Sequence, residues 1–362
     1  MAQTMTAVEK KAGNVSLKSK NSLSNAELDY MLEGCDDDFR VDGRACADIR
    51  PYSINGSSKT NSSPSTLVLS NGSARVSLPG GSTDIICSTK AEIARPALLK
   101  PNEGIVDVNV DYFSSSMHNN KRQRRHEETE LSQIISRLVL PNALSLPSLC
   151  ILPGKYCWKI SIDVLVLATD GCVTDVASMA IYKALNNTVL PVVKPIPKQT
   201  ESSNTGVGNK SNVRDDFIIE SGDVAEALIP DGADDCPILL TVCILQQQNP
   251  FFRDGTKRKH SAPAVMVLDC RLEEEMCALT KICVSVDRQG MICGVLKFGA
   301  GQGALPYRML TEITDLAVLS SKKIFEDILI PDMNDDDMNQ NEMTIANRGD
   351  LSDFLHGHFN FQ

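Results

Sequence analysis

Apolar and polar residues alternate along several stretches of the chain, and each such stretch predicts a strand with one buried face. Over 106–112, three valines and Tyr112 alternate with Asp107, Asn109 and Asp111. A second alternation runs over 158–166. Further strands are expected at 84–90, 238–246, 264–269, 281–287 and 291–298.

The dipeptide Asn71-Gly72 lies between strand-like runs at 66–70 and 73–78. Both residues tolerate the positive φ angles of a two-residue hairpin turn, and Asn-Gly is a strong short-range signal for one. We therefore expect a hairpin here. The Ser- and Asn-rich residues 53–65 before it predict a loop.

Apolar residues at helical spacing predict four helices. Ser24 and Glu27 form a capping box for the first, which should end at Gly34. Small and apolar residues along 177–185 predict another helix, and the last should begin near Pro306. The second helix has the apolar positions Leu131, Ile134, Ile135 and Leu138. The last has the stripe Met309, Ile313, Leu316, Ala317, Ser320 and Ile324.

Each block of strands ends in a helix, so we expect an α+β protein made of two related strand-rich units with packed helices. Polar composition at both ends predicts a disordered arm over 1–24 and an acidic disordered tail over 331–362. Between them we expect domain 1 over 25–192, a connector over 193–236 and domain 2 over 237–330.

The composition is that of a soluble globular protein, with 42% hydrophobic and 23% charged residues. The net charge is −10, whereas an isolated nucleic-acid binder is usually basic, so any contact with RNA should come from a local patch within an assembly. The twelve cysteines mostly lie in apolar runs without a C-x-x-C pair, which favours reduced thiols in a core. No membrane span, metal site or cofactor is expected, and His356 and His358 should be solvated tail residues.

Residues 168–180 predict the end of a buried strand, a tight turn at Gly171 and the start of a helix. Such a turn directs backbone N–H groups at an anion, usually phosphate. This turn contains no Lys or Arg, and Asp175 should lie where the anion would bind or complement the helix dipole. Thr174 is the expected N-cap. The segment is therefore a phosphate-type scaffold without a cation of its own.

Several segments, in order over about residues 25–330, resemble the RNase PH family. Arg40-Val41-Asp42-Gly43-Arg44 is similar to its N-terminal R-x-D-G-R signature. The other matching segments are 71–76, 90–93, 130–137, 170–185 and 269–275. Within the family, the run from Leu23 through Asp36-Asp37-Asp38 to Arg44 resembles a non-catalytic ring subunit of the eukaryotic RNA exosome, the counterpart of the inactive archaeal ring subunit.

This resemblance implies an RNase PH-like fold, of the ribosomal protein S5 domain 2-like type. It implies a structural subunit that supports 3′-to-5′ RNA processing and degradation, including rRNA processing. The implied partners are other RNase PH-like ring subunits, S1/KH cap subunits, RNA in the central channel and a separate nuclease. Ring neighbours should join through edge strands and apolar contacts. The implied locations are the nucleus, nucleolus and cytoplasm.

Phosphorolysis of RNA needs a cationic pocket for phosphate and an acid for the departing 3′ oxygen. Active family members resemble one another in having a Gly-Ser/Thr-Arg type turn. In the matching region, this chain lacks the arginine and has Asp175. Asp269 matches the family's first aspartate, and the longer Glu275 replaces the second. Alternatively, residues 273–275 form a solvated turn. We therefore expect no catalytic residue, with Asp269 and Glu275 as vestigial candidates.

The basic residues Lys121, Arg122, Arg124 and Arg125 precede the first long helix. In the family, an arginine in this neighbourhood contacts the RNA backbone, so the resemblance implies RNA binding through phosphates, without sequence readout. Glu127 is the nearer positional equivalent of that arginine, and a solvated loop is the alternative.

Three enzymatic alternatives remain. The chain could be a phosphorolytic 3′–5′ exoribonuclease by itself, or through a composite site with a neighbouring subunit. The run Gly299 to Ala304 fits the relaxed G-x-G-x-x-G/A nucleotide fingerprint. However, no further parallel strand and no acidic residue ending such a strand follow it, so a glycine-rich strand-to-helix turn is the preferred interpretation.

Overall fold

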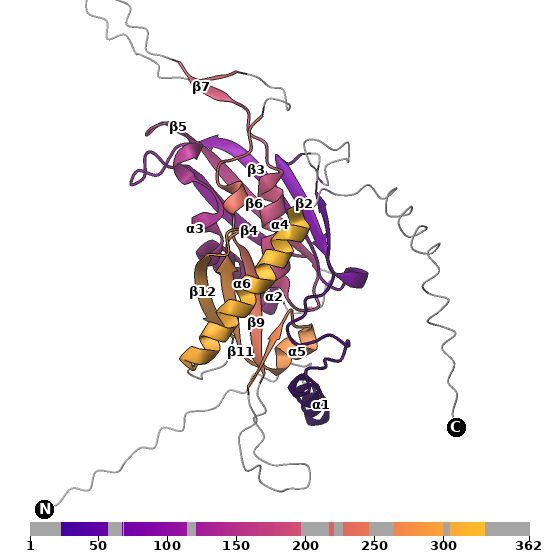
Figure 1. The fold of residues 1–362 in the computed structure, drawn as a ribbon. Helices are drawn as coiled ribbons and strands as arrows, with labels where there is room; N and C mark the ends of the chain where they lie inside the picture. Colours follow the sequence, from indigo (N-terminus) through magenta and orange to yellow (C-terminus); the bar gives the residue numbers. More distant parts are fainter. Residues whose placement is uncertain are drawn as a thin grey trace, which may run out of the picture.

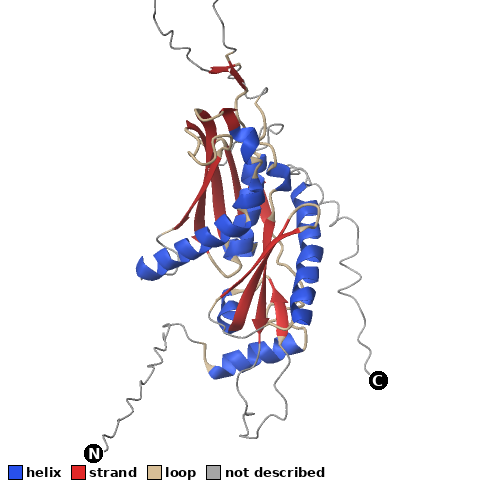
Figure 2. Cartoon of the chain, turned by 90° about the vertical axis from the view of Figure 1, so that its left-hand side faces the viewer, coloured by secondary structure: helices blue, strands red, loops and turns tan. Residues whose placement is uncertain are grey.

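The structure, a computed structural model, describes residues 23–56, 67, 69–113, 121–196, 217–220, 227–245, 264–299 and 305–329. They form two main sheets with helices packed on them and a small two-stranded sheet (Figures 1 and 2). The expected arm and tail lie almost wholly outside the described residues, as do the glycine-rich residues 300–304, His356 and His358. None of the helices in the described ranges is long and apolar enough to cross a membrane.

The first sheet has the strand order β1-β2-β3-β6-β4, and all its neighbouring strands are antiparallel except β4 and β6. Short β5 pairs with the start of β6. The sheet confirms the strands predicted at 84–90, 106–112 and 158–166, including the exposed carboxylates of the second. Its strands are β1 (Ser53–Gly56), β2 (Gly72–Ser77), β3 (Asp84–Ala94), β4 (Ile105–Tyr112), β5 (Cys150–Leu152) and β6 (Tyr156–Ala168).

The hairpin predicted at Asn71-Gly72 is wrong. β2 pairs with β1, which was predicted as loop, and with β3, which follows a turn at Pro79–Gly81. Asn71 instead accepts a hydrogen bond from the Ala91 N–H at 2.9 Å. A Cβ on Gly72 would lie 2.5 Å from the Ala184 oxygen of the neighbouring helix. The glycine therefore permits a close approach of strand and helix rather than a turn.

The helices confirm the predicted apolar stripes. They are α1 (Asn25–Asp36), α2 (Lys121–Leu138), α3 (Leu140–Ala143), α4 (Val173–Asn186), α5 (Leu272–Cys277) and α6 (Tyr307–Leu329), with 3-10 turns at Pro79–Gly81, Leu146–Leu149 and Ala233–Asp235. The capping box of α1 is present, although the helix continues two residues beyond Gly34. The N-cap of α4 is Cys172, not Thr174, because the helix already begins at Val173; Cys172 itself adopts a left-handed conformation.

The second sheet has the order β10-β9-β11-β12 and is antiparallel throughout. Its strands, β9 (Ile238–Leu245), β10 (Val265–Leu268), β11 (Ala278–Val286) and β12 (Ile292–Phe298), confirm the four predicted there. The strand before the glycine-rich run is thus an antiparallel edge strand, which disfavours the dinucleotide interpretation. In the connector, β7 (Val193–Pro195) pairs with β8 (Phe217–Ile219).

Helix α4 joins the two sheets into one core. It contacts β2 and β3 of the first sheet and β9 of the second, and ten of its fourteen residues are buried. β9 is buried along its whole length. One apolar cluster therefore includes side chains from both sheets. This packing places the start of α4 against the end of β10 and α5, while the proposed domain boundaries stay a prediction.

Candidate functional site

Gly171 brings the start of α4 against the segment that follows β10. Its φ angle is +79°, and a Cβ there would lie 2.3 Å from the Cys270 oxygen. No other residue type fits both the conformation and the space. Thr83 fixes the turn from the other side, because its hydroxyl donates to the Gly171 oxygen at 2.9 Å. The predicted anion-type turn is therefore present, and it faces residues 269–275.

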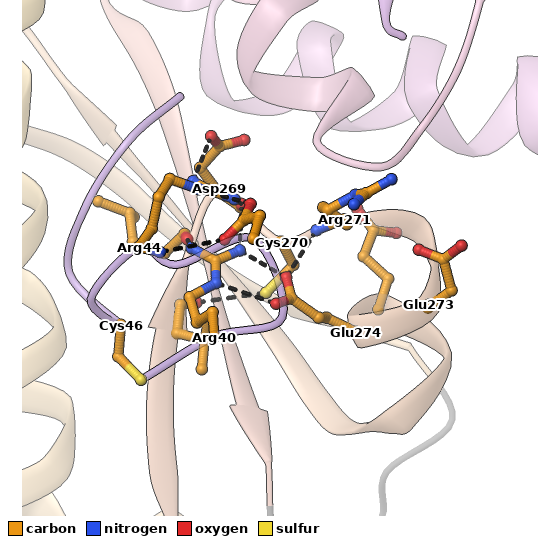
Figure 3. Close-up of polar contacts among 12 residues, drawn as sticks. Arg40, Arg44, Cys46, Asp269, Cys270, Arg271, Glu273 and Glu274 are labelled. Atoms are coloured by element: carbon orange, nitrogen blue, oxygen red, sulfur yellow. Dashed lines mark hydrogen bonds and ion pairs between the residues drawn. The ribbon is translucent and has the colours of Figure 1, made fainter. Parts of the chain in front are cut away.

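Asp269 lies at the end of β10 with only 3% of its surface exposed and a φ angle of +47°. Arg50 donates to its carboxylate from the backbone N–H at 2.6 Å and from Nη2 at 2.7 Å. Arg44 donates from Nη1 at 3.0 Å (Figure 3). Both carboxylate oxygens are thus occupied by donors from this chain. Such a paired, buried carboxylate helps to hold the end of β10 in place.

Arg40 and Glu274 form a second, fully buried pair beside the first. Arg40 Nε lies 2.9 Å from Glu274 Oε1, and its Nη1 and Nη2 donate to the backbone oxygens of Leu268 and Asp269 at 2.9 and 2.8 Å (Figure 3). The R-x-D-G-R segment therefore binds the end of β10 and α5. The alternative of a solvated turn at 273–275 is wrong, since Glu274 is 3% exposed.

Glu275 binds the turn at the start of α4. Its Oε1 accepts the backbone N–H of Cys172 at 2.7 Å, and its Oε2 pairs with Lys281. Burial lowers the pKa of Lys281, but the charge and hydrogen bond of Glu275 outweigh it and raise that pKa. A carboxylate of the chain itself therefore occupies the helix N-terminus, the place where such a turn usually holds an external anion.

The sequence-based expectation for Asp175 is partly wrong. The residue lies in the first turn of α4, but its carboxylate points into the core rather than at the anion position. Thr241 of β9 donates to it from the backbone N–H at 2.8 Å and from the hydroxyl at 2.6 Å. Burial raises the pKa of Asp175 to about 7, and the hydrogen bonds from Thr241 only partly offset this. Asp175 links the two sheets through α4.

The junction around Asp269 and Glu275 contains equal numbers of cations and carboxylates in contact with one another. Arg271 and Arg50 lie 3.3 and 3.6 Å from the Asp170 carboxylate, and Arg44 also pairs with Asp42. The five cations are Arg40, Arg44, Arg50, Arg271 and Lys281, and the five carboxylates are Asp42, Asp170, Asp269, Glu274 and Glu275. The formal charge therefore cancels within the junction.

The basic residues predicted to bind RNA lie on α2 and take no part in the ion pairs of the junction. The structure places them in the first two turns of the helix, not in a loop before it. Lys121, Arg122 and Arg125 are exposed, and Arg124 Nε lies 3.2 Å from Glu128 of the same helix. Cations at a helix N-terminus are disfavoured by the helix dipole, so this placement is not one that favours the helix itself.

Sequence reasoning missed Arg50, Arg271 and Lys281, the cations that lie nearest the turn. Arg50 is 219 residues from Asp269, and only the fold brings them together. As the sequence indicated, the residues around Gly171 include no Lys or Arg. The expectation that no cation lies beside this turn is nevertheless wrong. No local pattern would have found these residues, because each partner comes from a different element.

Comparison with known proteins agrees with this architecture. Residues 49–191 match the domain 1 model of the 3′ exoribonuclease family, RNase PH. An archaeal exosome core subunit superimposes with a TM-score of 0.57, covering 84% of this chain and 96% of that one at 19% identity. A subunit of the Archaeoglobus fulgidus exosome with RNA bound to the active site gives 0.58 over 83% and 97%, at 20% identity. The chain thus has the RNase PH-like fold, and its residues 49–191 are similar to domain 1 of that family.

The curated relatives are components of exosome complexes. The chain is 27% identical to exosome complex component Rrp42 of Sulfurisphaera tokodaii over 319 residues, which cover 87% of this chain and 98% of the relative. It is 26% identical to Rrp42 of Methanopyrus kandleri, over 79% and 89% of the two chains. Exosome complex component rrp43 of Schizosaccharomyces pombe is 30% identical over 45% and 57%.

Proposed function

We propose that this chain is a non-catalytic structural subunit of an RNA exosome ring that supports 3′-to-5′ RNA processing and degradation. One observation carries the non-catalytic part: the Glu275 carboxylate occupies the helix N-terminus within a junction whose charges cancel. Full-length similarity to exosome complex components supports the assembly part.

Phosphorolysis requires orthophosphate, an anion, to bind beside the turn. Two unit charges 4 Å apart interact by about 4 kcal/mol near a protein surface. Phosphate at the start of α4 would be repelled by Glu275 and would have to compete for Lys281, which already pairs with that carboxylate. The second requirement is an acid beside the departing 3′ oxygen, but both carboxylate oxygens of Asp269 are already engaged by Arg44 and Arg50.

The ring is proposed to contain other RNase PH-like subunits, with S1/KH cap subunits on one face. RNA passes through its central channel to a separate nuclease. Lys121, Arg122, Arg124 and Arg125 are proposed to line the path and to contact RNA phosphates. The proposed substrates include rRNA precursors, and the proposed locations are the nucleus, nucleolus and cytoplasm, which imaging of a tagged full-length chain tests.

The first experiment is native mass spectrometry of the full-length chain, alone and co-expressed with other RNase PH-like subunits. We expect a hetero-oligomeric ring that contains this chain. A stable monomer that joins no such subunit would contradict the structural role.

The second experiment measures release of nucleoside diphosphates from single-stranded RNA, with and without orthophosphate. We expect no phosphate-dependent release from the chain alone. In an assembly that does release them, Glu275→Gln and Asp269→Asn in this chain should leave the rate unchanged once folding of each variant is verified. Glu273→Gln in the same helix is the matched control.

The alternative is a phosphorolytic exoribonuclease that uses a composite site with a neighbour. The retained Asp269 and the nearby Arg44 and Arg50 favour it. It predicts release only with the partner, and a loss of at least about tenfold in Asp269→Asn but not in Glu273→Gln. That result would replace our proposal.

A further inference from the structure

Five of the twelve cysteines lie in one small apolar cluster near the R-x-D-G-R segment. Cys35, Cys46, Cys243 and Cys270 are buried in it, and Cys277 packs against them. They come from α1, the segment after it, β9, the end of β10 and α5. The sequence pattern predicted separate core residues. The fold instead concentrates their thiols in one place.

Cys35 and Cys46 are in direct contact. Cys46 Sγ lies 3.4 Å from the Cys35 carbonyl oxygen, and the Cys46 N–H donates to Asp38 at 2.8 Å, which holds the loop against the last turn of α1. The interaction between the two thiols lowers the pKa of Cys35 and, together with burial, raises the pKa of Cys46. A thiolate is the reactive form of cysteine, so Cys35 is the more reactive of the two thiols.

Two other thiols of the cluster, those of Cys270 and Cys277, favour the protonated form. Cys243 and Cys270 are 1% and 2% exposed, and the hydrogen bond with Cys243, together with burial, raises the pKa of Cys270. Cys277 Sγ lies 3.1 Å from the Glu273 oxygen, and burial raises the pKa of Cys277 to about 11. The cluster thus holds one activated thiol, Cys35, beside Cys46, Cys270 and Cys277, whose pKa values are raised.

We propose that Cys35 and Cys46 form an oxidative modification site, at which a peroxide converts the two thiols into a disulfide. The Cys35 thiolate attacks one peroxide oxygen, the O–O bond breaks, and a sulfenic acid and hydroxide form. The Cys46 sulfur then attacks the Cys35 sulfur, the S–S bond forms, and the oxygen leaves as water with the thiol proton. Two electrons pass from the sulfurs to one hydrogen peroxide, which becomes two waters.

The disulfide would join the last turn of α1 to the segment that carries Arg40 and Arg44. These arginines bind Glu274 and Asp269 at the junction. Oxidation would therefore restrain the N-terminal attachment of the junction. This inference does not depend on the proposed role in RNA processing.

The test treats the purified full-length chain with hydrogen peroxide, blocks remaining thiols with iodoacetamide and maps tryptic peptides without reductant. Arg40 and Arg44 lie between the two cysteines, so trypsin leaves the Cys35 and Cys46 peptides joined only by the disulfide. We expect the linked pair in the native chain and in Cys277→Ser, and its loss after dithiothreitol. Cys35 should lose its thiol at least about tenfold faster than Cys277.

Full alkylation of Cys35 and Cys46 after peroxide, in a chain that is still folded by circular dichroism, would overturn the proposal. So would a link from Cys35 to Cys270 or Cys277 in place of Cys46. A second measurement covers variants that fold poorly: oxidation should raise the Tm of the native chain reversibly and leave that of Cys46→Ser unchanged. An unchanged Tm of the native chain, with no linked peptide, would also overturn it.

Discussion

The junction around Asp269 and the start of α2 both gather arginine and lysine, yet they use them in opposite ways. In the junction, each cation contacts a carboxylate, and the buried Arg40 and Arg50 have partners more than 200 residues away in the chain. On α2, the basic residues follow one another along a helix, and Arg124 pairs with Glu128 one turn away. Three of these four basic side chains are exposed.

The difference shows what decides the role of a cation in this fold. A buried pair fixes the relative position of two elements, because removing one partner leaves an uncompensated charge in the core. An exposed pair contributes little, since water and salt screen it. Burial and the distance between partners along the chain, not residue type, separate the structural cations from those available to an external polyanion.

The largest effect is expected from Arg50→Ala, which leaves the Asp269 carboxylate buried without its main partner. The free energy of unfolding should fall by about 3–5 kcal/mol, measured by urea denaturation. Arg308→Ala is the matched control, because Arg308 makes an exposed pair with Glu312 at 3.0 Å. That variant should lose less than about 0.5 kcal/mol. Equal losses of unfolding free energy in the two variants would contradict the expected difference between buried and exposed ion pairs.

The next effect is a pH dependence carried by Asp175. Its pKa is raised from 3.8 to about 7 in the folded chain, so the folded state binds the proton more tightly than the unfolded state does. Its contribution to stability therefore falls as pH rises from about 4 to 7, by the order of 2–4 kcal/mol, and is flat above that range. Asp175→Asn should remove this component.

The measurement for Asp175 is the difference in unfolding free energy between the native chain and Asp175→Asn at several pH values. The native chain should gain relative to the variant as pH decreases through 7. Asp234→Asn, at an exposed position, is the matched control. If the difference in unfolding free energy between the native chain and Asp175→Asn does not change with pH, Asp175 is not the group that binds this proton.

A smaller effect is expected from Gly171→Ala, and Gly43→Ala separates its two causes. Both glycines have φ near +80°, but a Cβ on Gly171 would lie 2.3 Å from the backbone oxygen of Cys270, whereas a Cβ on Gly43 would have nothing within 4 Å. Gly43→Ala should cost about 1 kcal/mol through conformation alone. Gly171→Ala should cost about 2 kcal/mol more in thermal or urea unfolding, and equal costs would mean that α4 can move away from the junction.

The smallest effect concerns RNA. Lys121→Gln combined with Arg125→Gln should weaken binding of single-stranded RNA to the assembled ring by no more than about tenfold. The slope of log affinity against log salt should become shallower by about 0.7 for each phosphate that is no longer neutralised. Lys322→Gln with Lys323→Gln, two exposed lysines on α6, is the matched control. An unchanged salt slope would contradict the proposal that the basic residues of α2 contact RNA.

Periodicity predicted most strands and helices because each depends on residues close in sequence. It failed at Asn71-Gly72, where the tertiary contact with α4 decides the need for glycine. The turn pattern located Gly171, and the family resemblance pointed to Asp269 and Glu275. Asp175 was expected at the anion position or as a complement to the helix dipole, because no local pattern shows that its carboxylate binds Thr241 in the core. The sequence could not predict the partners of the buried arginines either, because these depend on how strands that are distant in sequence pack together.

The bond between Glu275 and the Cys172 amide has a consequence for how the chain responds to solution conditions. A protein that recruits a dissolved anion gains stability with the logarithm of that anion's concentration. Here the anion is covalently part of the polypeptide, so its local concentration never changes. At matched ionic strength, the melting temperature in phosphate should equal that in chloride, and the chain should hold its shape equally well whether cellular phosphate is scarce or abundant.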